Sequence, residues 1–268
     1  MFETLTFEHR RCCISSVVSA DRLKQITDAV REAGQLGVAE LAERTGASEM
    51  TIRRDLETLA AQGVLERYRG GARTLLLRGD EPPFALRAHE GLESKRRIAA
   101  EVAGLIVDGE SVVLDSGTTC LEVARALANR RLTVVPLSLH AVHELTGAPQ
   151  LTLLVPGGKP RAGELALTGP LTLSSLAALR FDTAILGCCG LGAADGLTAH
   201  DLDDAAVKRA AIASSRRVVV ATEAAKLART ALAFVAPITD LHAVVTDSTA
   251  SPDDTDALTA AGVTVRRV

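Results

Sequence analysis

Aromatic side chains are scarce in this sequence of 268 residues, which has no tryptophan, one tyrosine and five phenylalanines. A binding surface built from rows of stacking rings, such as the sheet platforms that bind single-stranded RNA, is therefore excluded. The hydrophobic fraction is nevertheless 47%. The core must consist mainly of Val, Leu, Ile and Ala.

Three further features are missing. No apolar run reaches the roughly 18 residues that span a bilayer, so we expect no membrane partner. The five cysteines, Cys12, Cys13, Cys120, Cys188 and Cys189, form no C-x-x-C pattern, which fits neither a zinc site nor a disulfide framework. We therefore expect reduced thiols, a cytoplasmic protein, and no metal or cofactor. With a formal net charge of −3, any contact with nucleic acid must come from a local patch.

The composition changes along the chain and predicts two domains. Residues 1–18 are expected to be a disordered tail, because their apolar part is too short for a signal peptide. Residues 19–74 have a short helical period, whereas short Val, Leu and Ile runs alternate with Ala-rich stretches from Ser111 onward. Residues 75–92, with Pro82 and Pro83 at their centre, are expected to be a linker, which leaves 93–268 as the second domain.

Apolar residues at helical spacing predict three helices in the first domain, and a strand with a hairpin turn follows them. The helices are expected around Leu23, Ile26 and Val30, then Val38 and Leu41, then Ile52, Leu56 and Leu59, and the strand at Val64–Arg69 before Gly70 and Gly71. Gly46 ends the second helix and Ser48 caps the third. This order is typical of a winged helix-turn-helix.

The start of the third helix carries the residues that a recognition helix presents to the major groove of DNA. The arginines there and on the wing can bind guanine or phosphate. The predicted contacts with double-stranded DNA are Ser48, Glu49, Met50, Thr51, Arg53, Arg54, Arg67, Arg69, Gly70 and Gly71. Asp55 is expected to pair with a neighbouring arginine instead, because phosphate would repel it. The alternative is a surface helix of an all-α bundle, whose charges are solvated.

In the second domain, strand and helix patterns alternate, which is typical of a mostly parallel sheet covered by helices. Strands are expected at 111–114, 132–135, 151–155, 183–186, 218–221, 243–246 and 263–265, and helices at 120–128, 139–145 and 205–214. The fold class is therefore α/β.

The run Asp115, Ser116, Gly117, Thr118 and Thr119 lies between a strand and a helix, where backbone N–H groups favour an anion such as phosphate. Ligands of open α/β sheets gather at the carboxyl ends of strands. Further polar residues expected there are Ser138, Gly157, Gly158, Lys208, Glu223 and Lys226. The alternative is a plain tight turn at Gly117, with Ser and Thr as caps.

The motif Ser48-Glu-Met-Thr51-Ile-Arg53-Arg54-Asp55-Leu56, followed by Arg69-Gly70-Gly71-Ala72, resembles the DeoR family of bacterial transcriptional regulators. The similarity continues through Lys95-Arg-Arg-Ile98 and Asp115–Thr119 to Thr246-Asp247. It implies a sugar-phosphate isomerase-like second domain that binds a phosphorylated sugar, with Asp115–Thr119, Asp204, Lys208 and Lys226 in the pocket.

The sequence departs from the family at two places. Pro136-Leu137-Ser138 stands where the family has Thr-Asn-Ser, and Glu223-Ala-Ala-Lys226 stands where it has Asp-x-x-Lys. The first change removes an amide that can donate and accept, and the second lengthens an acid by one methylene. Both bear on which effector is bound.

The resemblance implies a repressor of a carbohydrate operon that acts as a homo-oligomer, dimer or tetramer, and is released by its effector. Two alternatives stay open. One is an isomerase-like enzyme with an accessory DNA-binding domain, since Asp115, Glu164 and Asp204 could each act as a base. The other is a DNA-binding protein whose second domain serves only to oligomerise.

Overall fold

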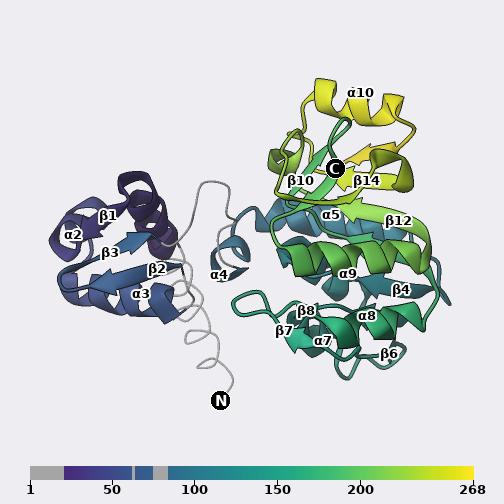
Figure 1. Ribbon diagram of the computed structural model, residues 1–268, viewed down its shortest axis with the longest axis horizontal. Helices are drawn as coiled ribbons and strands as arrows, with labels where there is room; N and C mark the ends of the chain where they lie inside the picture. The colour runs from purple at the N-terminus through teal and green to yellow at the C-terminus, as the bar shows by residue number, and fades with distance from the viewer. Residues whose placement is uncertain (1–20, 62–63, 75–83) are drawn as a thin grey trace, which may run out of the picture. The chain divides into compact units, whose positions relative to one another are not determined.

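The computed structural model describes residues 21–61, 64–74 and 84–268 (Figure 1). Along the chain, two compact units divide between Glu90 and Gly91. The tail expected at residues 1–18 and the first half of the expected linker, residues 75–83, lie outside the described residues. The rest of that linker is more ordered than we expected: α4 (Phe84–Arg87) is helical, and Leu86 belongs to the apolar core of the N-terminal unit.

The N-terminal unit is a winged helix-turn-helix, as predicted. Its elements are a helix over residues 21–33, β1 (Gln35–Gly37), α2 (Val38–Thr45), α3 (Glu49–Ala61), β2 (Leu65–Tyr68) and β3 (Gly71–Thr74). The strands form an antiparallel sheet in the order β1-β3-β2. The sequence did not predict β1, because this strand has only three residues, the last of them a glycine, and shows no alternation of apolar and polar residues. The predicted apolar face is buried, with Ile26, Leu41, Ile52 and Leu59 each 0% exposed.

Glycines and one serine determine where these elements turn. Gly46 ends α2 with φ of 68°, and the Oγ of Ser48 accepts a hydrogen bond from the N–H of Thr51 at 3.2 Å, which caps α3. Gly70 turns the wing with φ of 100°. At Gly71 a Cβ would lie 2.3 Å from the carbonyl oxygen of Leu36, so only glycine lets β3 pair with β1.

An ion pair ties the first helix to the recognition helix. Nε of Arg22 donates to Oδ2 of Asp55 at 2.5 Å, and Nη2 donates to Oδ1 at 3.3 Å. The side chain of Asp55 is 8% exposed and that of Arg22 is 20% exposed. Asp55 therefore pairs with an arginine 33 residues away rather than with its neighbours Arg53 or Arg54, and its role is to hold two helices together.

The C-terminal unit is built on a seven-stranded parallel sheet. Its strands, in the order β15-β14-β12-β9-β4-β5-β6, are β15 (Thr264–Arg267), β14 (Ala243–Thr246), β12 (Ser215–Ala221), β9 (Phe181–Leu186), β4 (Ser111–Leu114), β5 (Thr133–Pro136) and β6 (Thr152–Leu153). The α/β class is as predicted, and each predicted strand is present, although β6 is only two residues long.

Helices cover both faces of this sheet. One face carries α5 (Leu92–Gly104), α6 (Thr118–Leu127) and α7 (Leu139–Leu145), and the other carries α8 (Pro170–Ala177), α9 (Leu202–Ala213) and α10 (Pro252–Ala260). Alternate residues of a strand divide between the two cores: Val112 and Leu114 of β4 face the first set, and Val113 faces the second.

Several elements were not predicted, and one of them, α5, is 13 residues long. They are α5, α8, α10, the hairpin β7 (Lys159–Pro160) with β8 (Leu167–Thr168), and a small sheet in the order β10-β11-β13 with β10 (Gly190–Gly192), β11 (Gly196–Ala199) and β13 (Ala233–Ala236). Two-residue strands and glycine-bounded strands have no measurable period. In α10 only Thr255 and Leu258 are buried, so it lacks the apolar stripe that predicts a helix.

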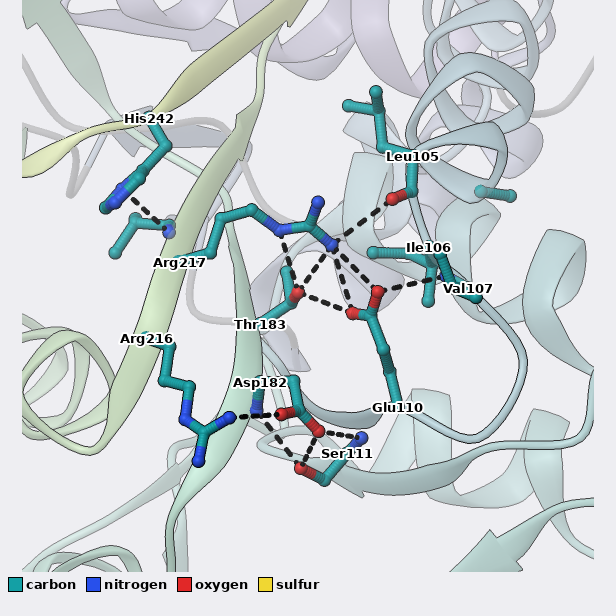
Figure 2. A network of polar contacts seen from close by, with 12 residues as sticks. Leu105, Ile106, Val107, Glu110, Ser111, Asp182, Thr183, Arg216, Arg217 and His242 are labelled. Atoms are coloured by element: carbon teal, nitrogen blue, oxygen red, sulfur yellow. Dashed lines mark hydrogen bonds and ion pairs between the residues drawn. The ribbon is translucent and has the colours of Figure 1, made fainter.

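At the amino ends of the strands, a polar network joins three neighbouring strands (Figure 2). Nη2 of Arg217 on β12 donates to Oε2 of Glu110 at 3.0 Å and to Oγ1 of Thr183 on β9 at 2.8 Å. Thr183 in turn donates to Oε2 of Glu110 at 2.7 Å, just before β4. These side chains satisfy one another, so this edge of the sheet is closed and rigid.

The order in which the chain connects the strands places a topological switch point between β4 and β9, at the opposite edge. It runs from β4 outward to β5 and β6, then returns to place β9 on the other side of β4. Connections therefore leave β4 and β9 in opposite directions, and ligands of open α/β sheets bind outside the carboxyl ends of such a strand pair. Asp115 follows β4 and Gly187 follows β9 at this position.

The pairing of Arg22 with Asp55 predicts a stability effect confined to the N-terminal unit. Arg22→Met leaves a mostly buried carboxylate without its partner and should cost about 2–3 kcal/mol. Native-state hydrogen exchange of the full chain should show this as faster exchange of the core amides of α2 and α3, with the C-terminal unit unchanged. Arg44→Met is the control: Arg44 and Glu40 are both about half exposed, so its effect should stay within about 0.5 kcal/mol. Equal effects of the two substitutions would contradict this role.

Candidate DNA interface and effector pocket

The predicted DNA contacts on the recognition helix are exposed. Ser48, Glu49 and Met50 lie at the start of α3, and Met50 is 78% exposed. A large apolar side chain at this position gains nothing from the core, and it is available for contact with a thymine methyl group. Thr51 is half-buried beside Ser48.

The arginines differ in how they are paired. Arg53 donates to Glu49 at 2.8 Å on the same helix, and Arg67 of the wing donates to Glu57 at 2.9 Å. All four of these side chains are 41–61% exposed, so these ion pairs are weak. Arg54 and Arg69 are exposed, and no acid of the described residues pairs with either. Arg54 and Arg69 can therefore bind phosphate without first breaking an ion pair. Arg53 and Arg67 would have to leave Glu49 and Glu57 to do so.

At the carboxyl edge of the C-terminal unit, a buried ion pair lies between β4 and α9. Asp115 is 1% exposed and Lys208 is 4% exposed, and Nζ of Lys208 donates to Oδ2 of Asp115. The same oxygen accepts the N–H of Gly187 at 2.9 Å, so it receives two donors. Oδ2 of Asp204, one turn before Lys208, lies 3.5 Å from the same ammonium.

The charge of Lys208 is stabilised in this cluster, whereas that of Asp204 is not. Burial lowers the pKa of Lys208, but the nearby carboxylates of Asp115 and Asp204 outweigh it, so the pKa is raised and the ammonium stays charged. Burial raises the pKa of Asp204 more strongly than Lys208 lowers it. Asp204 is held in place by the N-cap of α9, because Oδ1 of Asp201 accepts its N–H at 2.8 Å. The result is a rigid acid-lysine-acid array.

Three residues with hydroxyl groups follow Asp115 in the turn after β4. Ser116, Thr118 and Thr119 are 9%, 4% and 7% exposed, yet the structure gives their hydroxyls no hydrogen-bond partner among the described residues. Gly117 precedes α6 with φ of 98°, and no side chain caps the helix. Free N–H groups at a helix start favour an anion. In a plain tight turn, Ser and Thr hydroxyls normally accept hydrogen bonds from nearby backbone N–H groups as caps. These hydroxyls do not, which favours a ligand-binding role for the turn over the plain tight turn.

The predicted pair Glu223 and Lys226 lies after β12. Nζ of Lys226 donates to the carbonyl oxygen of Cys188 at 2.9 Å, which brings it to the end of β9. Glu223 lies 3.6 Å from Nζ of Lys95. Next to them, Asp247 accepts the N–H of Ala224 at 2.8 Å, which holds the Glu223–Lys226 turn against β14.

Three residues that were predicted to bind the effector, Ser138, Gly157 and Gly158, have local structural roles. No hydrogen bond or ion pair within the described residues joins them to Asp115, Lys208 or Asp204. Oγ of Ser138 accepts the N–H of His140 at 3.2 Å and caps α7. Gly157 accepts the hydroxyl of Thr172 at 2.8 Å, and a Cβ at Gly158 would lie 2.1 Å from that hydroxyl oxygen. These glycines are explained by close packing on α8.

Sequence reasoning missed two basic residues. Lys95 is 1% exposed, the largest of the fully buried side chains, and it lies on the inner face of α5 with Ile98 and Val102. Ile98 and Val102 lie three and seven residues after Lys95, so all three share one face of a helix. This pattern could have predicted from the sequence that the lysine is buried. Arg161 lies between β7 and β8 near Asp204, and no periodic pattern marks it.

The cysteines at this edge are free thiols, among those that the structure describes: Cys120, Cys188 and Cys189. Burial and the charge of Asp115 raise the pKa of Cys120, so it remains protonated. Sγ of Cys188 donates to Thr222 at 3.0 Å. Neither thiol is arranged as a nucleophile. Within the described residues there is also no cluster of metal-ligating side chains and no helix long and apolar enough to cross a bilayer.

Comparisons with known proteins agree with this arrangement. Residues 22–75 match the model of the DeoR-like helix-turn-helix domain, and residues 90–248 match that of the DeoR C terminal sensor domain. The transcriptional repressor AccR of Agrobacterium fabrum is 36% identical over 85% of this chain and 89% of its own length. The glycerol-3-phosphate regulon repressor of Escherichia coli is 33% identical over 83% and 88%, and the regulator GlpR of Haloferax volcanii is 31% identical over 93% and 98%.

Among solved structures, ribose 5-phosphate isomerase A of Methanocaldococcus jannaschii aligns with 49% of this chain and 52% of its own, at 17% identity and a TM-score of 0.37. The two matched family models lie in the two units and leave the whole tail, residues 1–18, outside. The resemblance seen in the sequence is therefore confirmed, and the chain belongs to the DeoR family of transcriptional regulators.

Proposed function

We propose that this regulator represses an operon of sugar or carbohydrate metabolism and that a phosphorylated sugar, or a related metabolite, releases it from its operator. Relatives with similarity over most of the chain are named as repressors and regulators, not as enzymes. The isomerase alternative therefore has no support. The domains would be those expected from the sequence, with DNA binding in 19–74 and effector sensing in 93–268.

One observation carries the effector proposal: unpartnered hydroxyls and a free helix start surround a buried acid-lysine pair at the crevice between β4 and β9. Phosphate oxygens would accept from the N–H groups and hydroxyls of Ser116, Thr118 and Thr119. Sugar hydroxyls can both donate and accept, which suits Asp115 and Lys208. Glu223 and Lys226 would bind on the far side of Gly187.

On DNA, the start of α3 would enter the major groove and the wing would follow the backbone. Arg54 and Arg69 would contact DNA directly, whereas Arg53 and Arg67 would first leave Glu49 and Glu57. A dimer or tetramer would place two recognition helices about 34–36 Å apart, or a multiple of that distance, in the cytoplasm where its DNA lies.

Release requires that the pocket act on the segment that leads to the DNA-binding domain. The chain enters the C-terminal unit at Gly91, which begins α5 with φ of 58°. A Cβ there would lie 2.6 Å from Oε1 of Glu223, and Lys95 of the same helix pairs with Glu223. A shift of Glu223 on effector binding would thus move the start of α5. Such coupling is typically 1–3 kcal/mol, or about 5–150-fold in operator affinity.

The DNA contacts are tested by Arg54→Ala, measured by fluorescence anisotropy on genomic fragments that the protein itself selects. Loss of one phosphate contact should lower the slope of log affinity against log salt by about 0.9, and a base contact should cost about 1–3 kcal/mol on the preferred sequence. Arg44→Ala on α2 is the control and should change neither quantity. If Arg54→Ala matched this control, α3 would not be the recognition helix.

The pocket is tested by Thr119→Val, which keeps the shape of the side chain and removes its hydroxyl. Sugar phosphates should raise the melting temperature of the wild-type protein by mass action, and the variant should bind roughly 10–100-fold more weakly because a hydrogen bond to a charged group is lost. Thr133→Val, at the amino end of β5, should bind normally. An unchanged affinity of Thr119→Val would place the effector elsewhere.

The coupling is tested by Gly91→Ala. The added methyl group would strain the backbone and press on Glu223, so operator affinity should respond less to the effector, with the ratio falling towards one. The readout is the ratio of operator affinities with and without saturating effector, because the methyl also presses on Glu223 of the proposed pocket and so changes effector affinity itself. Gly104→Ala, at the other end of α5 with no atom within 4 Å of its Cβ, should respond like the wild type. If operator affinity of Gly91→Ala responded to the effector as strongly as that of the wild type, coupling through Glu223 and the start of α5 would be excluded.

A further inference from the structure

The hairpin β7–β8 is fixed over the carboxyl end of β5. The N–H of Leu167 donates to the carbonyl oxygen of Leu137 at 2.8 Å, and the N–H of Leu139 donates to that of Leu165 at 3.0 Å. These bonds lie on either side of Ser138, which itself bridges to Ala166. Leu165 adopts φ of 51°, a strained conformation for leucine, so the loop is held by its surroundings.

Arg161 lies at the start of this loop and is half-buried. Its backbone N–H donates to the carbonyl oxygen of Ala166 at 2.8 Å, which fixes the residue's position. Its Nε, however, is buried and has no hydrogen-bond acceptor among the described residues. A charged donor without an acceptor is costly, because water can no longer solvate it. A residue in this state needs an explanation beyond packing.

The surroundings of Arg161 include the acid-lysine-acid array. Its charge is close enough to lower the pKa of Asp204, although no hydrogen bond joins the two side chains. Asp204 lies beside the ammonium of Lys208, which is bound to Asp115. Lys208 thus already has two carboxylates, whereas the buried Nε of Arg161 has no acceptor among the described residues. The guanidinium therefore adds a positive group to the pocket on the side of β5.

We propose that Arg161 binds the phosphate group of the effector and so makes the protein specific for phosphorylated over unphosphorylated sugars. The guanidinium is planar and has paired N–H donors, a geometry that matches two phosphate oxygens. The proposal rests on the proposed function, since it assigns one residue to the effector site. The hydroxyls of Ser116, Thr118 and Thr119 would then serve the remaining oxygens of the same group or of the sugar.

A purely structural role for Arg161 makes the opposite prediction for the free protein. If Arg161 held the hairpin in place, its removal would lower stability. If Arg161 serves a ligand instead, Arg161→Gln removes a buried N–H group that has no acceptor and should leave the melting temperature of the free protein unchanged or higher. Stability without ligand and affinity for ligand are therefore separate readouts.

The experiment uses the full chain, with titration calorimetry and thermal shift against inorganic phosphate, glycerol 3-phosphate, glucose 6-phosphate, fructose 6-phosphate and unphosphorylated fructose. Arg161→Gln should weaken the best phosphorylated probe roughly 10–100-fold and leave binding of fructose unchanged. Arg161→Lys keeps the charge without the paired donors and should lie between the two. Arg180→Gln is the matched control, since Arg180 is exposed and donates only to the carbonyl oxygens of Ala177 and Leu179.

The outcomes separate this proposal from the one it rests on. If the wild-type protein binds a phosphorylated probe and Arg161→Gln binds it equally well, the assignment of Arg161 is overturned and the effector proposal stands. If Arg161→Gln weakens phosphorylated and unphosphorylated probes alike and also lowers the melting temperature, Arg161 is structural. If the wild-type protein binds no phosphorylated probe, both proposals fail.

Discussion

The ion pair between Asp115 and Lys208 is the constraint on which the C-terminal unit depends. It joins the end of β4 to α9, which lies on the other side of the sheet from α6, and it draws Gly187 of the neighbouring strand to the same oxygen. Two buried charges are stable only when each is fully satisfied. The pair therefore fixes the spacing of the crevice and leaves the hydroxyls beside it free for a ligand.

The two edges of the sheet use polar groups in opposite ways. At the amino ends, Glu110, Thr183 and Arg217 satisfy one another, and nothing is left over. At the carboxyl ends, the Nε of Arg161 and the Oγ1 of Thr246 are buried without a hydrogen-bond partner among the described residues. Since unsatisfied buried polar groups cost stability, their concentration at one edge is what a binding site requires and a purely structural edge would avoid.

The sequence predicted elements with a strong period well and irregular ones poorly. The strand at 111–114 and the helix at 139–145 have their predicted bounds; the strand is a short apolar run buried on both faces, and the helix buries Ala141 and Leu145 on one side. The hairpin around Arg161 could not be predicted, since its two-residue strands are set by tertiary contacts with β5. Asp115 and Lys208 were predicted as neighbours from the family, but 93 residues separate them, so their direct bond required the fold.

Weak electrostatic attraction between the DNA-binding domain and DNA suits a regulator that has to dissociate from its operator. With a net charge of −3 for the whole chain, and with Arg53 and Arg67 partly neutralised by Glu49 and Glu57, sequence-independent attraction to phosphate is small. In the proposed dimer or tetramer, affinity for the operator would then depend on correct placement of two recognition helices. Because misplacement of one helix loses contacts that electrostatics cannot replace, a coupling of only about 1–3 kcal/mol from the pocket is enough for release.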